Sequence, residues 1–168
     1  MTPDPYRTPD PETLTRIDTA IAGMTHAILA CHDPAGHGPL MSRIACQRLP
    51  DGRIMALLSG LAGHSHALAA DPRAGLFITP AAGQSRNPMA AARLSLQCRA
   101  RKEGPPTAAQ RHDWLARDPL AQVFIDLPDF ALWHLTVTAG LWNAGFGRAF
   151  RLTHTNLPPA PASDSPPA

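Results

Sequence analysis

The chain has 168 residues, 44% of them hydrophobic, and a formal net charge of +2. That length suits one domain with a single core, and so small a charge without a long basic run argues against a nucleic-acid-binding protein. No apolar run is long enough to span a membrane, and the first residues lack the apolar core of a secretory signal, so we expect a cytoplasmic protein without membrane contact. Its three cysteines, Cys31, Cys46 and Cys98, are then expected to be buried free thiols.

The first third of the chain is predicted to hold a helix and two strands. Residues 1–9 include three prolines and are expected to form a flexible arm. Asp10-Pro11-Glu12 has the capping carboxylate and the proline of a helix start, and apolar residues at helical spacing continue the helix to about Gly23. Residues 25–31 and 39–47 are predicted strands, the second with Met41, Arg43 and Ala45 on one face.

The stretch of residues 54–77 combines a buried strand, a turn and a short helix. Its apolar run ends at Ser59, which can cap a helix, and the helical pattern continues to Asp71-Pro72. Residues 74–78 are the next predicted strand. The free N–H groups of a helix start attract anions, phosphate included. The polar side chains that the sequence gathers near this helix start are Ser59, His64, Ser65 and His66.

The second half of the chain is predicted to be mainly extended. Residues 93–101 alternate between apolar and polar and indicate a half-buried strand. Thr107 and Gln110 form a capping-box pattern at the start of a helix. Residues 130–137 and 140–150 are expected to form two closing strands, because both are rich in aromatic and branched residues.

Together these elements predict a mainly β fold of the α+β class. Five or six extended segments with short turns, and only two or three helices, favour an antiparallel barrel or a sandwich. We expect one domain over residues 10–154. The proline-rich residues 155–168 are expected to be a disordered tail.

Three blocks of sequence, in this order, resemble the pyridoxamine-phosphate-oxidase-like FMN-binding split barrels, and within them the heme-utilisation (HugZ-type) group. The blocks are ALLSGLAGHSHALAADPRAGLF, NPMAAARLSLQCRAR and LARDPLAQVFIDLPDFALWHLTVTAGLWNAGFGRAF. The resemblance implies a six-stranded antiparallel Greek-key split β-barrel with a few flanking helices, which forms a homodimer with FMN at the interface. It also implies a flavin-dependent oxidoreductase for a small-molecule substrate, with no side chain assigned as catalytic acid or base.

The same resemblance implies which residues hold FMN. In the family, an arginine on the strand before the hairpin and a segment that runs from a serine to His-Ser/Thr grip the phosphate and the ribityl chain. One departure concerns His66, which stands where the family has arginine or lysine. An imidazole is fully cationic only if the phosphate raises its pKa, so FMN affinity is expected to fall as the pH rises through about 7 and 8. The cofactor-binding residues predicted here are Arg43, Leu58, Ser59, His64, Ser65, His66 and Arg93, the last with a surface salt bridge as its alternative role.

Two other functions remain open on the same fold. A heme-binding or heme-degrading protein would need a histidine to bind the iron, with His64, His66 and His154 as candidates. A dimeric binding module without tight FMN binding is the other, and His66 favours it. No metal site is predicted, since His64 and His66 lie two residues apart and face different sides of a helix. Trp133 and Trp142 are expected to pack in the barrel or at the interface, or to stack on the flavin.

Overall fold

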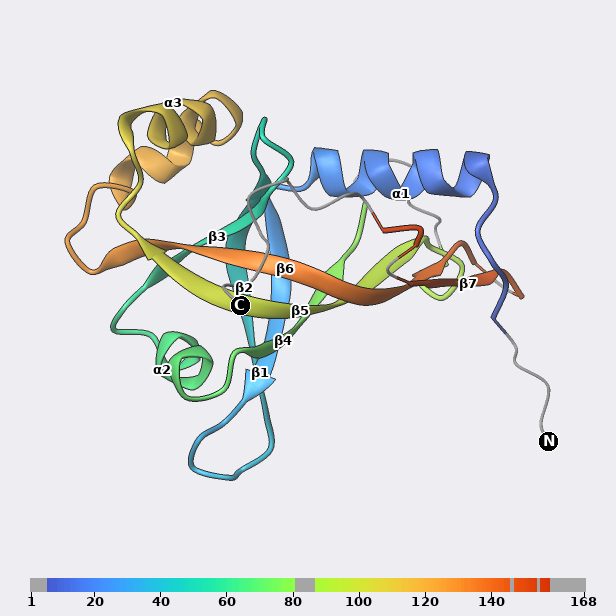
Figure 1. Ribbon diagram of the computed structural model, residues 1–168, viewed down its shortest axis with the longest axis horizontal. Coiled ribbons are helices and arrows are strands. Elements are labelled where there is room, and N and C mark those ends of the chain that lie inside the picture. The colour runs from blue at the N-terminus through green and yellow to red at the C-terminus, as the bar shows by residue number, and fades with distance from the viewer. Residues whose placement is uncertain (1–5, 81–86, 146, 154, 158–168) are drawn as a thin grey trace.

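A closed antiparallel barrel of six strands forms the centre of the protein, with a short seventh strand beside it (Figure 1). The computed structural model describes residues 6–80, 87–145, 147–153 and 155–157. The predicted mainly β fold is confirmed. Its strands are β1 (His26–His32), β2 (Pro39–Arg48), β3 (Ile54–Ser59), β4 (Arg73–Ile78), β5 (Arg93–Gly104), β6 (Phe130–Asn143) and β7 (Ala149–Leu152). The helices are α1 (Pro11–Gly23), α2 (Gly63–Ala70), α3 (Ala108–Arg117) and the 3-10 turn η1 (Pro119–Val123).

The strands follow the order β3-β2-β1-β4-β5-β6, and pairing of β3 with β6 closes the barrel. The order 3-2-1-4 is that of a Greek key, because β4 returns to lie beside β1. One edge of β6 is shared by two partners: residues 130–134 pair with β3, and residues 140–143 pair with β7. The strands of the barrel therefore separate beyond residue 134, where β6 no longer pairs with β3. This separation accounts for the split form of the barrel.

The predicted break between residues 137 and 140 is wrong, since β6 runs unbroken from Phe130 to Asn143. Gly140 lies inside this strand, where its lack of a side chain serves packing. A Cβ at this position would lie 2.9 Å from Leu96 Cδ2, 3.0 Å from the Ser95 carbonyl oxygen and 3.1 Å from Leu152 Cδ1. Gly140 thus lets β5 and β7 approach β6 from either side.

Replacing Gly140 with Ala is expected to lower the free energy of unfolding by about 1–3 kcal/mol, the usual effect of an overpacked core. Gly23→Ala is the matched control, because nothing lies within 4 Å of its added Cβ. That control should leave the stability unchanged or raise it by up to about 1 kcal/mol. Urea denaturation of both variants measures the difference, and equal midpoints would remove the packing role of Gly140.

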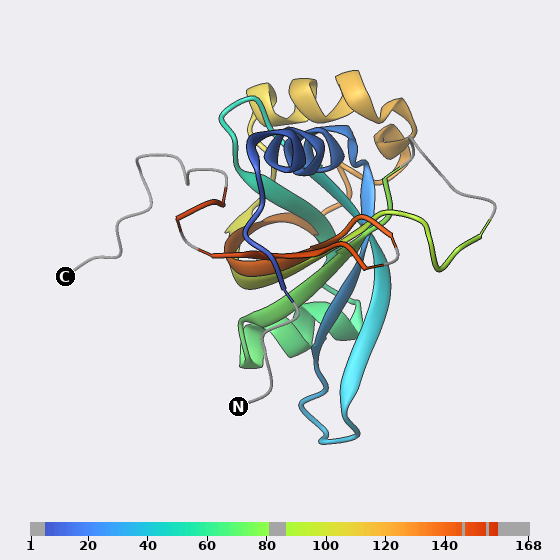
Figure 2. The ribbon, with the colours of Figure 1, turned by 90° about the vertical axis from the view of Figure 1, so that its right-hand side faces the viewer.

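Helix α1 begins as predicted. The Asp10 carboxylate accepts a hydrogen bond of 2.8 Å from the Thr13 amide, with Pro11 as the first helical residue. Its buried face, which includes Ile17, Ala20 and Ile21, joins the residues of the barrel interior in one core. Figure 2 shows α1 near the top of the molecule and α2 in its lower half, beside the strands. No helix among the described residues is long and apolar enough to cross a membrane.

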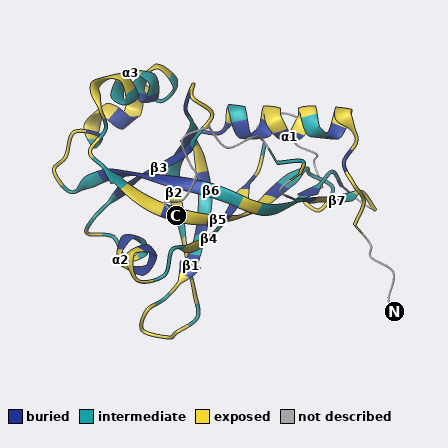
Figure 3. Ribbon diagram, viewed as in Figure 1, coloured by how far each residue is buried: buried dark blue, intermediate teal, exposed yellow. Residues whose placement is uncertain are grey.

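A second, smaller core lies outside the barrel, between β3 and the helices α3 and η1 (Figure 3). Met55 and Leu57 point away from the barrel interior and pack with Trp114 of α3 and Ile125. Residues 54–58 of β3 are therefore buried on both faces, which explains their unbroken apolar run. The predicted capping box of α3 is present, with Thr107 and Gln110 in their reciprocal hydrogen bonds.

Residues near the N-terminus contact the last strand, β7. In the predicted arm, residues 1–5 lie outside the described residues, whereas Arg7 pairs with β7: its amide donates to the Ala149 carbonyl at 2.9 Å. Arg151 lies over the Tyr6 ring, 4.9 Å from its centre. Most of the predicted tail, residues 158–168, also lies outside the described residues. All three cysteines are free and buried.

Candidate functional site

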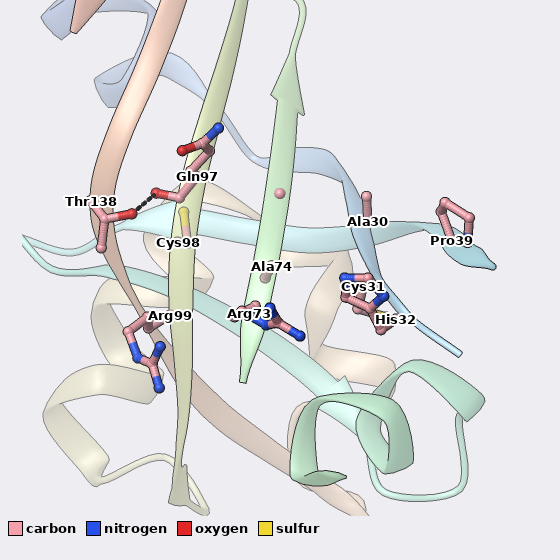
Figure 4. Close-up of a pocket in the computed structure, with 11 residues that line it drawn as sticks. Ala30, Cys31, His32, Pro39, Arg73, Ala74, Gln97, Cys98, Arg99 and Thr138 are labelled. Carbon is pink, nitrogen blue, oxygen red and sulfur yellow. Dashed lines mark hydrogen bonds between the residues drawn. The ribbon is translucent and has the colours of Figure 1, made fainter. Parts of the chain in front are cut away.

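A groove of about 480 Å³ runs across the outer wall of the barrel, over β1, β4 and β5 (Figure 4). We call it the wall groove. Strand alternation places one side chain in two on this outer face. The groove is lined by Ala30, Cys31, His32, Pro39, Arg73, Ala74, Gly75, Gln97, Cys98, Arg99 and Thr138.

Two arginines stand opposite each other at one end of the wall groove. Arg73 of β4 and Arg99 of β5 are direct cross-strand partners, and both side chains are exposed. Like charges in this arrangement repel each other. In Figure 4, Arg73 lies between Arg99 and His32, so three nitrogen-bearing side chains face one end of the groove.

The two arginines differ in their partners. Arg73 pairs with Asp71, with its Nη2 2.6 Å from Oδ2, and these hydrogen bonds hold the pKa of the Asp71 carboxyl well below its usual range. Asp71 is therefore charged at neutral pH and offsets Arg73. Arg99 has no ion pair or hydrogen bond to its side chain among the described residues. The groove thus keeps one uncompensated guanidinium, which favours an anion.

The floor of the wall groove is made of small residues. Ala30 and Gly75 are cross-strand partners, and Gly75 in turn pairs with Gln97. A Cβ on Gly75 would lie 3.7 Å from Ala30 Cβ, so it would point outward beside that methyl group. A floor without large side chains leaves room for a flat ring system against the sheet.

A β-bulge shapes the far side of the groove. Gln97 pairs with Ala139 and Cys98 pairs with Val137, which leaves Thr138 as the extra residue of β6. The Thr138 hydroxyl donates a hydrogen bond of 3.1 Å to the Gln97 carbonyl, drawn in Figure 4. Such bulges redirect side chains and are frequent beside functional sites.

The predicted serines take part in the turn that links β3 to α2. Ser59 donates to Asp129 Oδ2 at 2.5 Å and accepts from the Leu61 amide at 3.1 Å. The Ser65 hydroxyl donates to the Ser59 carbonyl at 2.6 Å. Helix α2 begins only at Gly63, with no side-chain cap, so the expected capping role of Ser59 is wrong. The Ser59 oxygen accepts from the Leu61 amide in the turn, and the residue at the N-cap position of α2 is Ala62.

The other predicted residues are spread over the barrel. His64 is half-buried on α2, and burial lowers the pKa of its imidazole, so it favours the neutral form. His66 is exposed on the same helix. Arg43 is exposed on the outer face of β2, opposite Ile28, on the same wall as the groove. His154 lies outside the described residues.

Leu58 and Arg93 contact other parts of the protein itself, in the core and at a loop. Leu58 is a core residue of the barrel. The Arg93 guanidinium donates to the carbonyls of Met89 and Ala91, at 3.3 and 3.2 Å. Trp133 and Trp142 are both core residues, and Trp142 also lines a cavity beneath α1. None of the seven predicted residues lines the wall groove, and no cluster of three metal-ligating side chains is found in the described ranges.

Sequence reasoning missed the residues that line the groove, namely His32, Arg73, Gly75, Gln97 and Arg99. Part of the signal was present at outward positions in the predicted strands and at the residues directly beside them. Gln97 and Arg99 alternate with buried Leu96, Cys98 and Ala100, while Arg73 and Gly75 alternate in the strand paired with them. What the sequence alone lacked was the pairing of β4 with β5 in this register.

The comparisons with known proteins come from solved structures. No protein-family model matches the sequence, and no curated protein matches it. One solved chain is 44% identical with a TM-score of 0.84, and the match covers 90% of this chain and 98% of that one.

Two further structures carry descriptions. A heme binding protein from Mycobacterium smegmatis is 30% identical with a TM-score of 0.72; the match covers 90% of this chain, which spans 61% of that protein's length. A general stress protein 26 relative of the pyridoxinephosphate oxidase family from Clostridium acetobutylicum shares the fold, at 12% identity, a TM-score of 0.65 and coverage of 88% and 98%. The structural neighbours of the chain therefore match the split-barrel fold of the pyridoxamine-phosphate-oxidase-like proteins, and they include heme-binding proteins of the heme-utilisation (HugZ-type) kind.

Proposed function

We propose that the wall groove binds FMN and that the protein is a flavin-dependent oxidoreductase. The observation that carries the proposal is Arg99, an exposed guanidinium with no acidic partner among the described residues, next to Arg73 and at the edge of a floor formed by Ala30 and Gly75. FMN offers both matching parts, a phosphate dianion and a flat ring system. Arg99 would pair with the phosphate, and the small residues would face the ring.

The rest of the groove supplies polar contacts. The Gln97 side chain has donors and an acceptor for the polar edge of a ring, and it is exposed on the groove wall. Bound flavin would supply one- and two-electron transfer, while the protein binds it, orients it and limits the access of water. Arg43 and the segment of residues 59–66 remain proposed contacts, on the same wall and at the N-terminal end of α2.

We further propose that two copies pair through this wall and cover the cofactor. Beside the groove, Met41 and Phe77 are 65% and 39% exposed, although both sit in strands of the barrel. Met41 is a cross-strand partner of Ala30 on the groove floor. Exposed apolar side chains that border a binding groove are typical of a protein interface. Sedimentation equilibrium tests this, and a monomer at micromolar concentration would contradict it.

The absorption spectrum of the purified protein, before and after addition of FMN, tests the cofactor proposal. We expect flavin bands that stay with the protein through gel filtration. Reduction of the bound flavin by NADH or NADPH, with no second substrate present, then tests the oxidoreductase activity. The reduction is followed as bleaching of the flavin bands. A protein that takes up neither FMN nor hemin would instead be a dimeric binding module.

Heme is the second candidate, and His32 is the observation that favours it. His32 lines the groove on β1, two residues from Ala30, where its imidazole could bind an iron, while Arg73 and Arg99 could pair with the two heme carboxylates. The 30% identical relative described as a heme binding protein adds to this case. Hemin titration of wild type and His32→Ala separates the two cofactors: only heme binding should depend on His32.

Filling the groove floor should weaken FMN binding while the fold is kept. Gly75→Val places its Cβ at ordinary contact distances, 3.7 Å from Ala30 Cβ and 3.8 Å from the Leu96 carbonyl, and the added methyl groups project into the groove. We expect the affinity for FMN to fall at least about tenfold, which is about 1.4 kcal/mol. Ser95→Val, exposed on β5 outside the groove, is the control. An unchanged affinity of Gly75→Val, measured by flavin fluorescence, would place the cofactor elsewhere.

A further inference from the structure

A larger cavity of about 720 Å³ lies at the other end of the molecule, between α1 and the barrel. We call it the α1 cavity. Its walls come from α1, from the start of β1, from the end of β4 and from the segment between β6 and β7. None of the described residues lines both this cavity and the wall groove. A cavity of this volume is typical of a small-molecule site.

The charged residues that line the α1 cavity are of one sign. Arg16 and Arg148 contribute guanidinium groups, His26 adds an imidazole, and no aspartate or glutamate is among the described residues that line the cavity. Arg16 has an outside partner, Glu12, with Nη2 2.9 Å from Oε1 and both side chains more than half exposed. Such a surface pair contributes little and can be displaced by an anion inside the cavity. Arg148 Nη2 donates to the Ala144 carbonyl at 3.1 Å, which leaves its other N–H groups available.

The interior wall of the α1 cavity is apolar. It includes Ala20 and Met24 from the α1 side and Ile78 and Trp142 from the barrel, all of them buried. The turn that carries Arg148 lies close to this wall at Gly145. Gly145 has a φ of +108°, and it approaches Ala90 so closely that a Cβ there would lie 3.0 Å from the Ala90 carbonyl oxygen. Charge at the rim and apolar surface inside suit a ligand with the same two parts.

We infer that the α1 cavity is a second binding site, for an amphipathic organic anion: a carboxylate or sulfonate on an aromatic or aliphatic body. The anionic group would lie between Arg16 and Arg148, with the apolar body against Met24, Ile78 and Trp142. This site is independent of the cofactor groove, since it lies on different elements and needs no FMN.

Two fluorescent probes of similar shape test the site in the full chain. 1-Anilinonaphthalene-8-sulfonate carries the anion, and N-phenyl-1-naphthylamine lacks it. We expect the sulfonate to bind the wild type, and the double variant Arg16→Gln/Arg148→Gln to weaken it about tenfold or more, the usual effect of losing charged hydrogen bonds. Binding of the neutral probe should not change. Both arginines are exposed, so the fold should survive, and thermal unfolding checks this.

Thr19→Trp provides the second variant, because Thr19 is exposed on α1 and lines the cavity. Its indole should block both probes. Arg99→Gln, in the wall groove, is the control and should leave sulfonate binding unchanged. The proposal is overturned if the sulfonate does not bind, if Thr19→Trp and the double variant bind it like wild type, or if Arg99→Gln alone weakens it.

Discussion

Replacing Arg117 with Ala is expected to lower the free energy of unfolding by about 3 kcal/mol, because three carbonyl groups lose a charged donor at once. Arg117 ends α3, and its guanidinium is half-buried against two other elements. It donates to the Arg48 carbonyl at 2.6 Å, to the Met24 carbonyl at 3.1 Å, and to the Ala22 carbonyl.

These carbonyls lie at the end of β2 and around the C-terminus of α1. The last carbonyls of a helix have no partner within it, and a cation there is also favoured by the helix dipole. Arg117 therefore joins α3, α1 and β2 through one side chain. Without it, Ala22 and Met24 lose acceptor partners that water reaches only in part.

Urea denaturation of Arg117→Ala measures this loss. Arg111→Ala is the control on the same helix, where the arginine pairs with Asp126 at 2.7 Å on the surface. We expect it to lower the stability by no more than about 1 kcal/mol. Arg117→Lys should lie between the two, since an ammonium cannot reach three carbonyls in the arginine geometry. Equal stabilities of the two alanine variants would show that Arg117 does not join these elements.

Replacing Arg99 with Gln is expected to weaken FMN binding by about 1.5–3 kcal/mol, the usual size of a charged hydrogen bond. The same variant should leave the stability of the cofactor-free protein unchanged or slightly higher, because Arg73 loses a like-charged cross-strand neighbour. Opposite effects on binding and on folding distinguish a ligand contact from a structural residue.

Arg101→Gln is the matched control, two residues further along β5. Its guanidinium is exposed and pairs with Glu103 at 3.0 Å, outside the groove. Isothermal titration of FMN into both variants measures the difference. An equal loss for Arg99→Gln and Arg101→Gln would indicate a general effect of surface charge and would remove Arg99 from the site.

Much of the fold follows from local patterns in the sequence. The Asp10-Pro11 start of α1, the capping box of α3 and the alternation along β5 each depend on neighbours within a few residues, and each prediction is confirmed. The break expected near Gly140 failed for a different reason. A glycine that permits close packing and a glycine that forms a turn look the same in one sequence, and only the contacts with Leu96 and Leu152 separate them.

The wall groove could not be predicted because it depends on long-range register. Arg73 and Arg99 are 26 residues apart in number, and they face each other only because β4 pairs with β5 as it does. The segment around Ser59 could be singled out because its polar residues are close in sequence. Asp129, which takes up the Ser59 hydroxyl, is again a distant residue.

Mapping FMN onto the protein by NMR tests the central claim most directly. The amide signals of isotope-labelled protein are followed as FMN is added, and the spectra without FMN and at saturating FMN are compared. We predict that the largest shifts cluster at His32, Gly75, Gln97 and Arg99, on the three strands of the wall groove. Shifts confined to the Ser59–Ser65 turn, or to α1, with the groove signals unmoved, would contradict the account.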